Sequence, residues 1–147
     1  MQNIRIYEMP DCKMVSSGTG MFGEGKFGRF EEWFSSQKRG LFPKDFLFQE
    51  GDGFHWLYMY EEGMSVPPEF DIIDFKGGLY AVATDIDQQT DMEKINAELN
   101  KFLTDNGFEH DGLRPQMGNV ITSPLASKIM RYEQMDYYFP VRAKKMP

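Results

Sequence analysis

The sequence predicts an α+β fold, in which an antiparallel sheet carries two helices on one side and a ligand groove on the other. Three observations lead to this prediction. Short apolar stretches are separated by turn residues, two longer segments carry apolar residues at helical spacing, and the order of these elements repeats after about 66 residues. The 147 residues are therefore expected to form a single domain of two strand–helix–strand–strand modules, which cover residues 1–66 and 67–147.

Turn and cap residues predict the elements of the first module. Phe27, Phe30 and Phe34 fall at helical spacing, and Gly40 is a typical residue beyond a helix C-terminus. A Gly-Asp-Gly turn at residues 51–53 separates two apolar stretches, as in a hairpin. The predicted elements are extended segments at 4–7 and 13–16, a glycine-rich loop, a helix at 26–39, and strands at 46–48 and 54–61.

The second module repeats this order after a double proline. A capping box at residues 90–93 begins a helix whose apolar stripe includes Ile95 and Leu99, and Gly107 ends it. The predicted elements are extended segments at 72–75 and 79–84, a helix between 90 and 107, and strands at 119–122 and 134–141, the last two separated by a short connector.

The strand at residues 54–61 has one wholly aromatic face, formed by Phe54, Trp56, Tyr58 and Tyr60. Tyrosine hydroxyls and the indole N–H need hydrogen-bond partners, so this face suits the wall of a binding site better than a dry core. We therefore place it on the open side of the sheet.

The final strand alternates in the same way. Gln134, Asp136 and Tyr138 are expected on the open side with the aromatic face. The side chains expected to face the helices are Met135, Tyr137, Phe139 and Val141.

Composition excludes several classes of function. The formal charge of −7 argues against a nucleic-acid or anionic-membrane surface, because both need a basic patch. A single cysteine, Cys12, rules out an internal disulfide and a multi-thiolate metal site. Neither a signal-peptide core nor a long apolar run is present, so the chain is expected in the cytoplasm. No metal and no cofactor are predicted.

Three segments resemble one family in their order and spacing: FKGGLYAV at residues 75–82, NGFE at 106–109 and QMDYYFPV at 134–141. With the duplication, they are similar over most of the chain to the GyrI-like domain, also described as the AraC-type effector-binding domain. The resemblance implies a ligand groove between the two halves. It also implies a bacterial sensor of amphipathic, often cationic, lipophilic compounds, either attached to a transcription regulator or standing alone. Some standalone relatives resemble small hydrolases.

The sequence departs from this family at one position. Family members often carry a glutamate, followed two residues later by a tyrosine, before an Asn-Asp-Pro turn. Aligning that proline with Pro124 places Gly118 at the glutamate position and Val120 at the tyrosine position. The missing acid is expected to be replaced by Asp136 or Glu133 in or beside the final strand.

Other features of the sequence are typical of cofactor sites or catalysis. Residues 18–23 read GTGMFG, which matches a dinucleotide fingerprint, but the preceding strand is half polar and the following helix begins too late. A mobile loop over the groove is the preferred interpretation. His55 shares a strand face with Leu57 and Met59, so it is expected to be structural. No Ser, His and Asp set has a recognisable spacing, and no catalytic residue is predicted.

We therefore predict a binding protein for a small amphipathic molecule, aromatic or a lipophilic cation, that acts as a sensor in bacterial transcription regulation or drug response. The alternatives are a small hydrolase that uses a groove carboxylate, and a protein-binding module that uses the aromatic face. No direct contact with nucleic acid or membrane is expected. The candidate ligand-binding residues are Trp56, Tyr58, Tyr60, Tyr80, Asn119, Asp136 and Tyr138.

Overall fold

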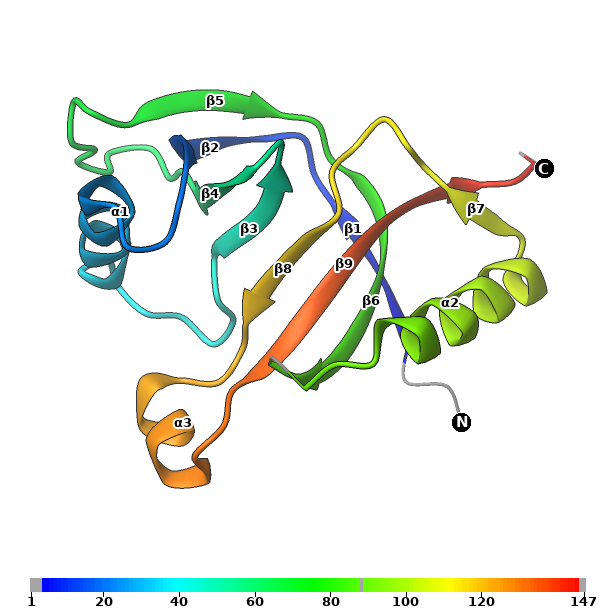
Figure 1. Cartoon of the computed structure of the whole chain (residues 1–147). Coiled ribbons are helices and arrows are strands. Elements are labelled where there is room, and N and C mark those ends of the chain that lie inside the picture. Colours follow the sequence, from blue (N-terminus) through cyan, green and yellow to red (C-terminus); the bar gives the residue numbers. More distant parts are fainter. Residues whose placement is uncertain (1–3, 88, 146–147) are drawn as a thin grey trace. The chain divides into compact units, whose positions relative to one another are not determined.

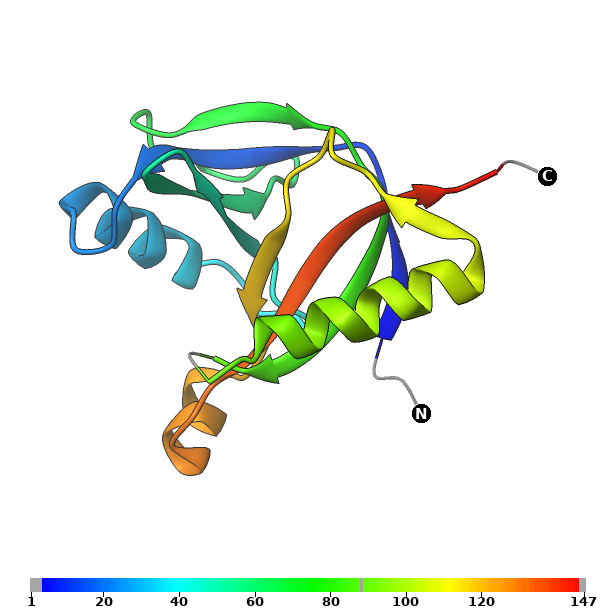
Figure 2. The same cartoon turned by 45° about the vertical axis from the view of Figure 1, so that its right-hand side comes forward.

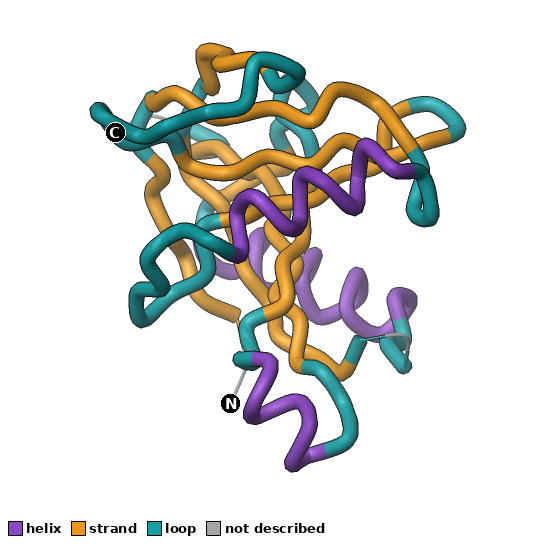
Figure 3. Tube along the Cα trace, turned by 90° about the vertical axis from the view of Figure 1, so that its left-hand side faces the viewer, coloured by secondary structure: helices purple, strands orange, loops and turns teal. Residues whose placement is uncertain are grey.

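A computed structural model of the chain describes residues 4–87 and 89–145. Within these residues, three helices and nine strands are joined by loops and turns (Figure 3). All strand pairs in both units are antiparallel, so the predicted α+β fold on antiparallel strands is confirmed. The chain divides into two compact units, unit 1 from Met1–Pro10 with Gly77–Pro147, and unit 2 from Asp11–Lys76. Each unit is described separately below.

Unit 2 is a four-stranded antiparallel sheet in the order β3-β4-β2-β5, with one helix (Figure 1). The elements of unit 2 are β2 (Cys12–Gly20), α1 (Gly25–Ser35), β3 (Asp45–Glu50), β4 (Gly53–Met59) and β5 (Asp71–Phe75). The turn at residues 51–53 joins β3 to β4, as predicted.

The core of unit 2 is aromatic. Phe27 and Phe30 of α1 pack against Trp56 and Tyr58 of β4, together with Val15 of β2. The ring centre of Phe30 has four other aromatic ring centres within 6.0 Å. Edge and tilted ring contacts of this kind add to the free energy gained by burying the rings.

Unit 1 has the strand order β1-β6-β9-β8, and β7 pairs with the far end of β9. Helix α2 runs across β6 and β9 (Figure 2). The elements are β1 (Ile4–Met9), β6 (Gly78–Ile86), α2 (Met92–Asn106), β7 (Phe108–His110), β8 (Met117–Val120), α3 (Pro124–Met130) and β9 (Gln134–Ala143).

The core beneath α2 is mainly aliphatic. Ile95, Leu99 and Leu103 project from α2 at the predicted spacing and pack on the small side chains of Ala81 and Ala83. The remaining fully buried members of this cluster are Phe139 and Val141 of β9. The predicted end of this helix at Gly107 is correct, since Gly107 has a left-handed φ of 81°.

The first strands of the two predicted modules are exchanged between the compact units. β1 pairs with β6, and β5 pairs with β2. The unit boundaries therefore fall between residues 10 and 11 and between residues 76 and 77, whereas the two predicted modules meet between residues 66 and 67.

Three local features differ from the sequence-based expectations. The expected connector between the last two strands contains α3, a helix of seven residues, none of them buried. Seven residues are too few for the repeated apolar spacing that predicts a longer helix. Helix α1 ends at Ser35, four residues before the predicted end at residue 39. Gly18 and Gly20 lie inside β2 and not in a loop. In the described residues, no helix combines the length and apolar character needed to cross a membrane.

Candidate functional site

Four of the seven predicted site residues lie in unit 1, namely Tyr80, Asn119, Asp136 and Tyr138. Asp136 of β9 pairs with Asn119 of β8 on one side and with Thr84 of β6 on the other, so these three residues lie side by side in the sheet. Tyr138 lies two residues further along β9, on the same face. This face is opposite the one that packs on α2, as the alternation along 134–141 predicts. We call the polar cluster the group Arg5, Tyr80, Thr84, Asn119, Asp136 and Tyr138.

Asp136 is held by two donors. Its Oδ1 accepts hydrogen bonds from Arg5 Nη2 at 2.8 Å and from Thr84 Oγ1 at 2.5 Å. The Asp136 side chain is 6% exposed and that of Arg5 is 39% exposed. Burial opposes the charge on Arg5, but the ion pair and hydrogen bond with Asp136 outweigh it and raise the Arg5 pKa. The negative charge of Asp136 is therefore already paired with the positive charge of Arg5, and a cationic ligand must compete with Arg5 for it.

Asn119 is the least satisfied member of the polar cluster. Burial raises the pKa of Tyr138 to about 12, the charge of Asp136 adds to this effect, and a hydrogen-bonding interaction with the Asn119 amide partly opposes it. Within the part of the chain that the structure describes, neither Nδ2 nor Oδ1 of the buried Asn119 makes a hydrogen bond of normal geometry. A buried polar group left in this state costs about 1–3 kcal/mol.

Tyr80 is fixed between a ring and a cation. Its ring meets that of Tyr138 edge-on, with centroids 6.1 Å apart, and the Arg114 guanidinium carbon lies 4.7 Å from the Tyr80 centroid. Arg114 is held by Asp111 at 3.0 Å and by the carbonyl oxygens of Leu79 and Val141. One face of Tyr80 is thus already occupied by the protein's own cation.

Position 118 does not face the polar cluster. Gly118 lies directly opposite Tyr137, whose ring packs with the α2 core, so a side chain there points away from Asp136. A Cβ at Gly118 would meet Met135 Cε at 2.5 Å, because Met135 fills this space. Asn119 is the β8 residue that faces the cluster. The alignment that placed Gly118 at the glutamate position therefore selects a residue on the α2 side of the sheet, and not one that faces the polar cluster.

The predicted aromatic face of β4 is not on an open side of the sheet. Trp56 and Tyr58 are buried beneath α1, and Tyr60, just beyond β4, packs at the edge of the same cluster. The reason is that α1 is itself aromatic. Phe34 stacks on Tyr58 at 5.6 Å, and rings of this kind are best buried against one another. The polar tip of Trp56 is satisfied by Asp45 Oδ2 at 3.1 Å.

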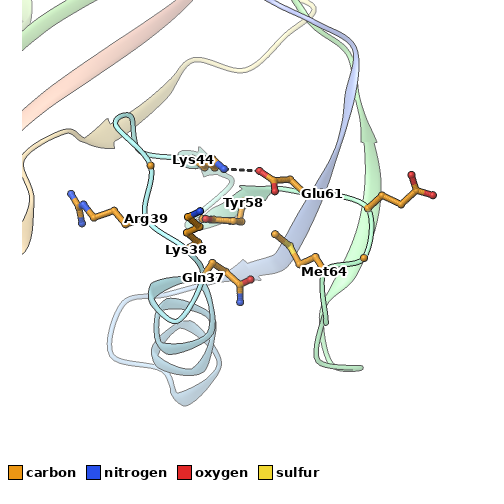
Figure 4. Close-up of a pocket in the computed structure, with 10 residues that line it drawn as sticks. Gln37, Lys38, Arg39, Lys44, Tyr58, Glu61 and Met64 are labelled. Atoms are coloured by element: carbon orange, nitrogen blue, oxygen red, sulfur yellow. Dashed lines mark hydrogen bonds and ion pairs between the residues drawn. The ribbon is translucent and has the colours of Figure 1, made fainter.

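Tyr58 also lines a pocket of about 490 Å³ in unit 2 (Figure 4). Lys44 and Glu61 point toward each other there, with 2.5 Å between Nζ and Oε1, and their hydrogen bond lowers the pKa of Glu61. The other lining residues are Gln37, Lys38, Arg39, Gly40, Glu62, Gly63 and Met64. This pocket is mixed in charge, and Tyr58 is the one predicted site residue that lines it.

Sequence analysis missed Arg5 and Thr84. The sequence alternation could have placed Arg5 on the correct face of the sheet. Ile4 and Ile6 pack toward the α2 core, so Arg5 between them faces the other side. Its contact with Asp136, however, spans 131 positions in the sequence and depends on β1 pairing with β6.

Comparison with solved structures identifies proteins of the same fold. A hydrolase from Listeria innocua superposes with a TM-score of 0.69 at 10% sequence identity, over 95% of this chain and 92% of that one. The EcmrR C-terminal domain matches with a TM-score of 0.61 at 9% identity, over 95% of this chain and 97% of the domain. SAV2435 bound to tetraphenylphosphonium matches with a TM-score of 0.52 at 12% identity, over 96% and 94% of the two chains.

No protein-family model matches the chain, and no curated protein matches it in sequence. At identities of 9–12%, the structural likeness shows a shared fold. This fold is consistent with the resemblance to GyrI-like effector-binding domains.

Proposed function

We propose that the chain binds a small amphipathic molecule at the polar cluster and acts as an effector-binding domain in bacterial transcription regulation or drug response. The observation that carries the proposal is the buried Asn119 amide, which lacks normal hydrogen bonds among the described residues and lies beside Tyr138. A ligand that makes well-aligned hydrogen bonds with this amide and packs against the neighbouring rings gains free energy from both contacts.

Two of the structural neighbours support this proposal. One is a domain of EcmrR, a protein seen elsewhere in complex with DNA, and the other is SAV2435 in complex with a lipophilic cation. The same fold thus occurs with a ligand of the predicted chemical class.

The ligand's charge follows from the Arg5–Asp136 pair. A lipophilic cation gains from Asp136 only if it displaces Arg5, whereas a neutral aromatic molecule leaves the pair intact. We therefore expect neutral planar aromatics to bind the native protein at least as well as cations of the same size.

Thermal unfolding in the presence of a ligand panel tests the proposal. The panel contains tetraphenylphosphonium, tetraphenylborate as the matched anion, and neutral planar aromatics. A ligand at about 100 times its Kd adds about 2.7 kcal/mol to stability, which raises Tm by several degrees. Absence of a shift with every member contradicts the proposal.

An Asn119→Leu variant locates the site. Leucine has a similar volume and no polar group, so the unliganded variant should keep or slightly raise the native Tm. The ligand-induced shift should fall by more than half. Asn100→Leu, at an exposed position of α2, is the matched control and should retain the full shift. A full shift in Asn119→Leu would exclude Asn119 from the site.

Replacing Arg5 tests the charge argument. Arg5→Met frees the buried carboxylate of Asp136, so we expect the variant to lose about 2 kcal/mol of unfolding free energy and to favour cations over neutral ligands about tenfold more than the native protein. The double variant Arg5→Met/Asp136→Asn should regain part of the stability and lose the new preference. Urea unfolding measures the stability, and isothermal titration with tetraphenylphosphonium and with a neutral aromatic of the same size measures the preference. An unchanged preference in Arg5→Met contradicts the argument.

A hydrolase with Asp136 as general base is less well supported. The Asp136 side chain is 6% exposed, and its Oδ1 already accepts hydrogen bonds from Arg5 and Thr84, so a reacting water would have to displace one of these donors.

A further inference from the structure

Three side chains of unit 2 form a linked set that neither the proposed ligand site nor the aromatic core uses. Ser16 Oγ is hydrogen-bonded to His55 Nε2, and His55 Nδ1 lies 2.7 Å from Glu50 Oε2. Ser16 and His55 alternate with Val15 and Trp56, which pack beneath α1, so the set lies on the other face of the sheet. The chain holds two histidines, and only this one contacts a serine in the described residues.

A β-bulge brings Ser16 and His55 together. Ser16 pairs with Leu57 and Thr19 pairs with His55, so β2 has one residue more than β4 between these two pairs. Gly18 takes up the bulge with a φ of 71°, and Ser17 Oγ accepts a hydrogen bond from the Trp56 backbone N–H. Bulges of this type re-aim a side chain and are frequent beside active sites.

Contacts with Glu50 and Phe48 hold the imidazole in one orientation. A charged Glu50 carboxylate can only accept, so its Oε2 accepts a hydrogen bond from His55 Nδ1, and its Oε1 accepts one from Thr19 Oγ1 at 2.9 Å. Hydrogen bonds from His55, and then from Thr19, lower the Glu50 pKa, so the carboxylate is charged. The Phe48 ring stacks on the imidazole with centroids 4.9 Å apart. Nε2 is thereby left as the nitrogen that accepts the Ser16 proton.

We propose that Ser16 is an activated nucleophile, with His55 as its general base and Glu50 as a positioning residue, and that it hydrolyses small acyl esters. A serine whose proton faces a histidine that a carboxylate orients is recognised by this geometry and not by its place in the sequence. This activity is independent of the ligand binding proposed above.

The chemistry is balanced within these groups. The Ser16 proton moves to His55 Nε2 as Oγ bonds to the ester carbon, and the same proton then protonates the departing alkoxide as its C–O bond breaks. Water repeats the sequence on the acyl-serine, giving a carboxylic acid and restoring Ser16.

Burial limits the substrates. Ser16 is 4% exposed, whereas the side chains of His55 and Glu50 are 15% and 48% exposed, so the set runs from the interior to the surface. An acyl donor must reach Ser16 along the imidazole. We therefore expect acetyl and propionyl esters to react and long-chain or branched esters to fail.

The test uses the intact chain with 4-nitrophenyl acetate and with a small sulfonyl fluoride. Mass spectrometry should find one adduct, on the peptide that contains Ser16. Ser16→Ala should abolish it, and His55→Gln should slow acylation by about 100-fold or more. Ser36→Ala and His110→Gln are matched controls, and both should react at the native rate.

Glu50→Gln separates positioning from a merely structural role. The variant should lower kcat about tenfold with KM nearly unchanged, and it should move the pH profile of acylation. Absence of an adduct in the native protein, an adduct on another residue, or labelling that is unaffected in His55→Gln would each overturn the proposal. Circular dichroism of each variant verifies that it is folded.

Discussion

The two units use the same arrangement, one helix on an antiparallel sheet, but fill it differently. Beneath α2 the sheet offers alanines to the leucine and isoleucine side chains of the helix, whereas beneath α1 both surfaces are aromatic. In unit 1 the polar cluster, with the rings of Tyr80 and Tyr138, lies on the face away from the helix. The comparison teaches that an aromatic strand face is not in itself a sign of a binding site. The residues of the covering helix decide which face becomes core.

The largest expected effect comes from truncating one core residue in each unit. Phe30→Ala should cost about 3–5 kcal/mol of unfolding free energy, and Leu99→Ala about 2–5 kcal/mol, because both side chains are fully buried and Phe30 also loses its ring contacts. Urea unfolding measures both losses. Both tryptophans lie in unit 2, so their fluorescence follows that unit, and circular dichroism follows the whole chain. A smaller loss for Phe30→Ala than for Leu99→Ala would contradict the ring-contact argument.

A tyrosine in each unit gives the next effect, which depends on pH. Burial raises the pKa of Tyr138 to about 12 and also raises that of Tyr58, but Lys44 partly opposes the second shift. Between pH 10 and pH 12 the unfolded chain releases a proton that folded Tyr138 retains, so stability is lost as the pH rises through this window.

Tyr138→Phe should therefore reduce the fall in the urea midpoint between about pH 9 and pH 12. Tyr58→Phe should reduce it less, and Tyr132→Phe, at an exposed position, is the matched control. An equal slope in the native protein and Tyr138→Phe would show that burial of this phenol does not persist in solution.

Helix caps give the smallest effect. Asp91 caps α2 by accepting from the Lys94 N–H, whereas Glu24, the cap residue of α1, makes no capping bond with its side chain in the described chain. Asp91→Ala should cost about 1 kcal/mol, and Glu24→Ala less than about 0.5 kcal/mol. Thermal unfolding of both variants measures the difference, and equal losses would contradict it.

Local signals in the sequence predicted much of the fold. The end of α2 at Gly107, the hairpin between β3 and β4, and the alternation along β9 all follow from residues close together in the chain. The predicted cap of α2 was one residue early, because Asp91 and not Thr90 accepts the capping bond. Thr90 instead bonds to the Tyr137 hydroxyl.

The parts that sequence analysis missed depend on non-local contacts. Both faces of residues 54–61 carry apolar groups, so nothing in that strand alone states which face α1 covers. The contact of Ser16 with His55 requires the β2–β4 register and a one-residue bulge within it. Spacing along the chain holds no information about either, and for this reason no Ser–His set was predicted.

The exchanged strands bear on how the protein is made on the ribosome. Unit 2 is one continuous stretch, Asp11–Lys76, so all of its residues are available once that stretch has been synthesised. Unit 1 is assembled around β9, which pairs with β6, β7 and β8 and is the last strand in the described chain. Until Gln134–Ala143 emerges, β6 and β8 keep open edges of the kind that recruit other strands. During this interval the nascent chain holds all of unit 2 but only part of unit 1, so we expect aggregation to be most frequent then.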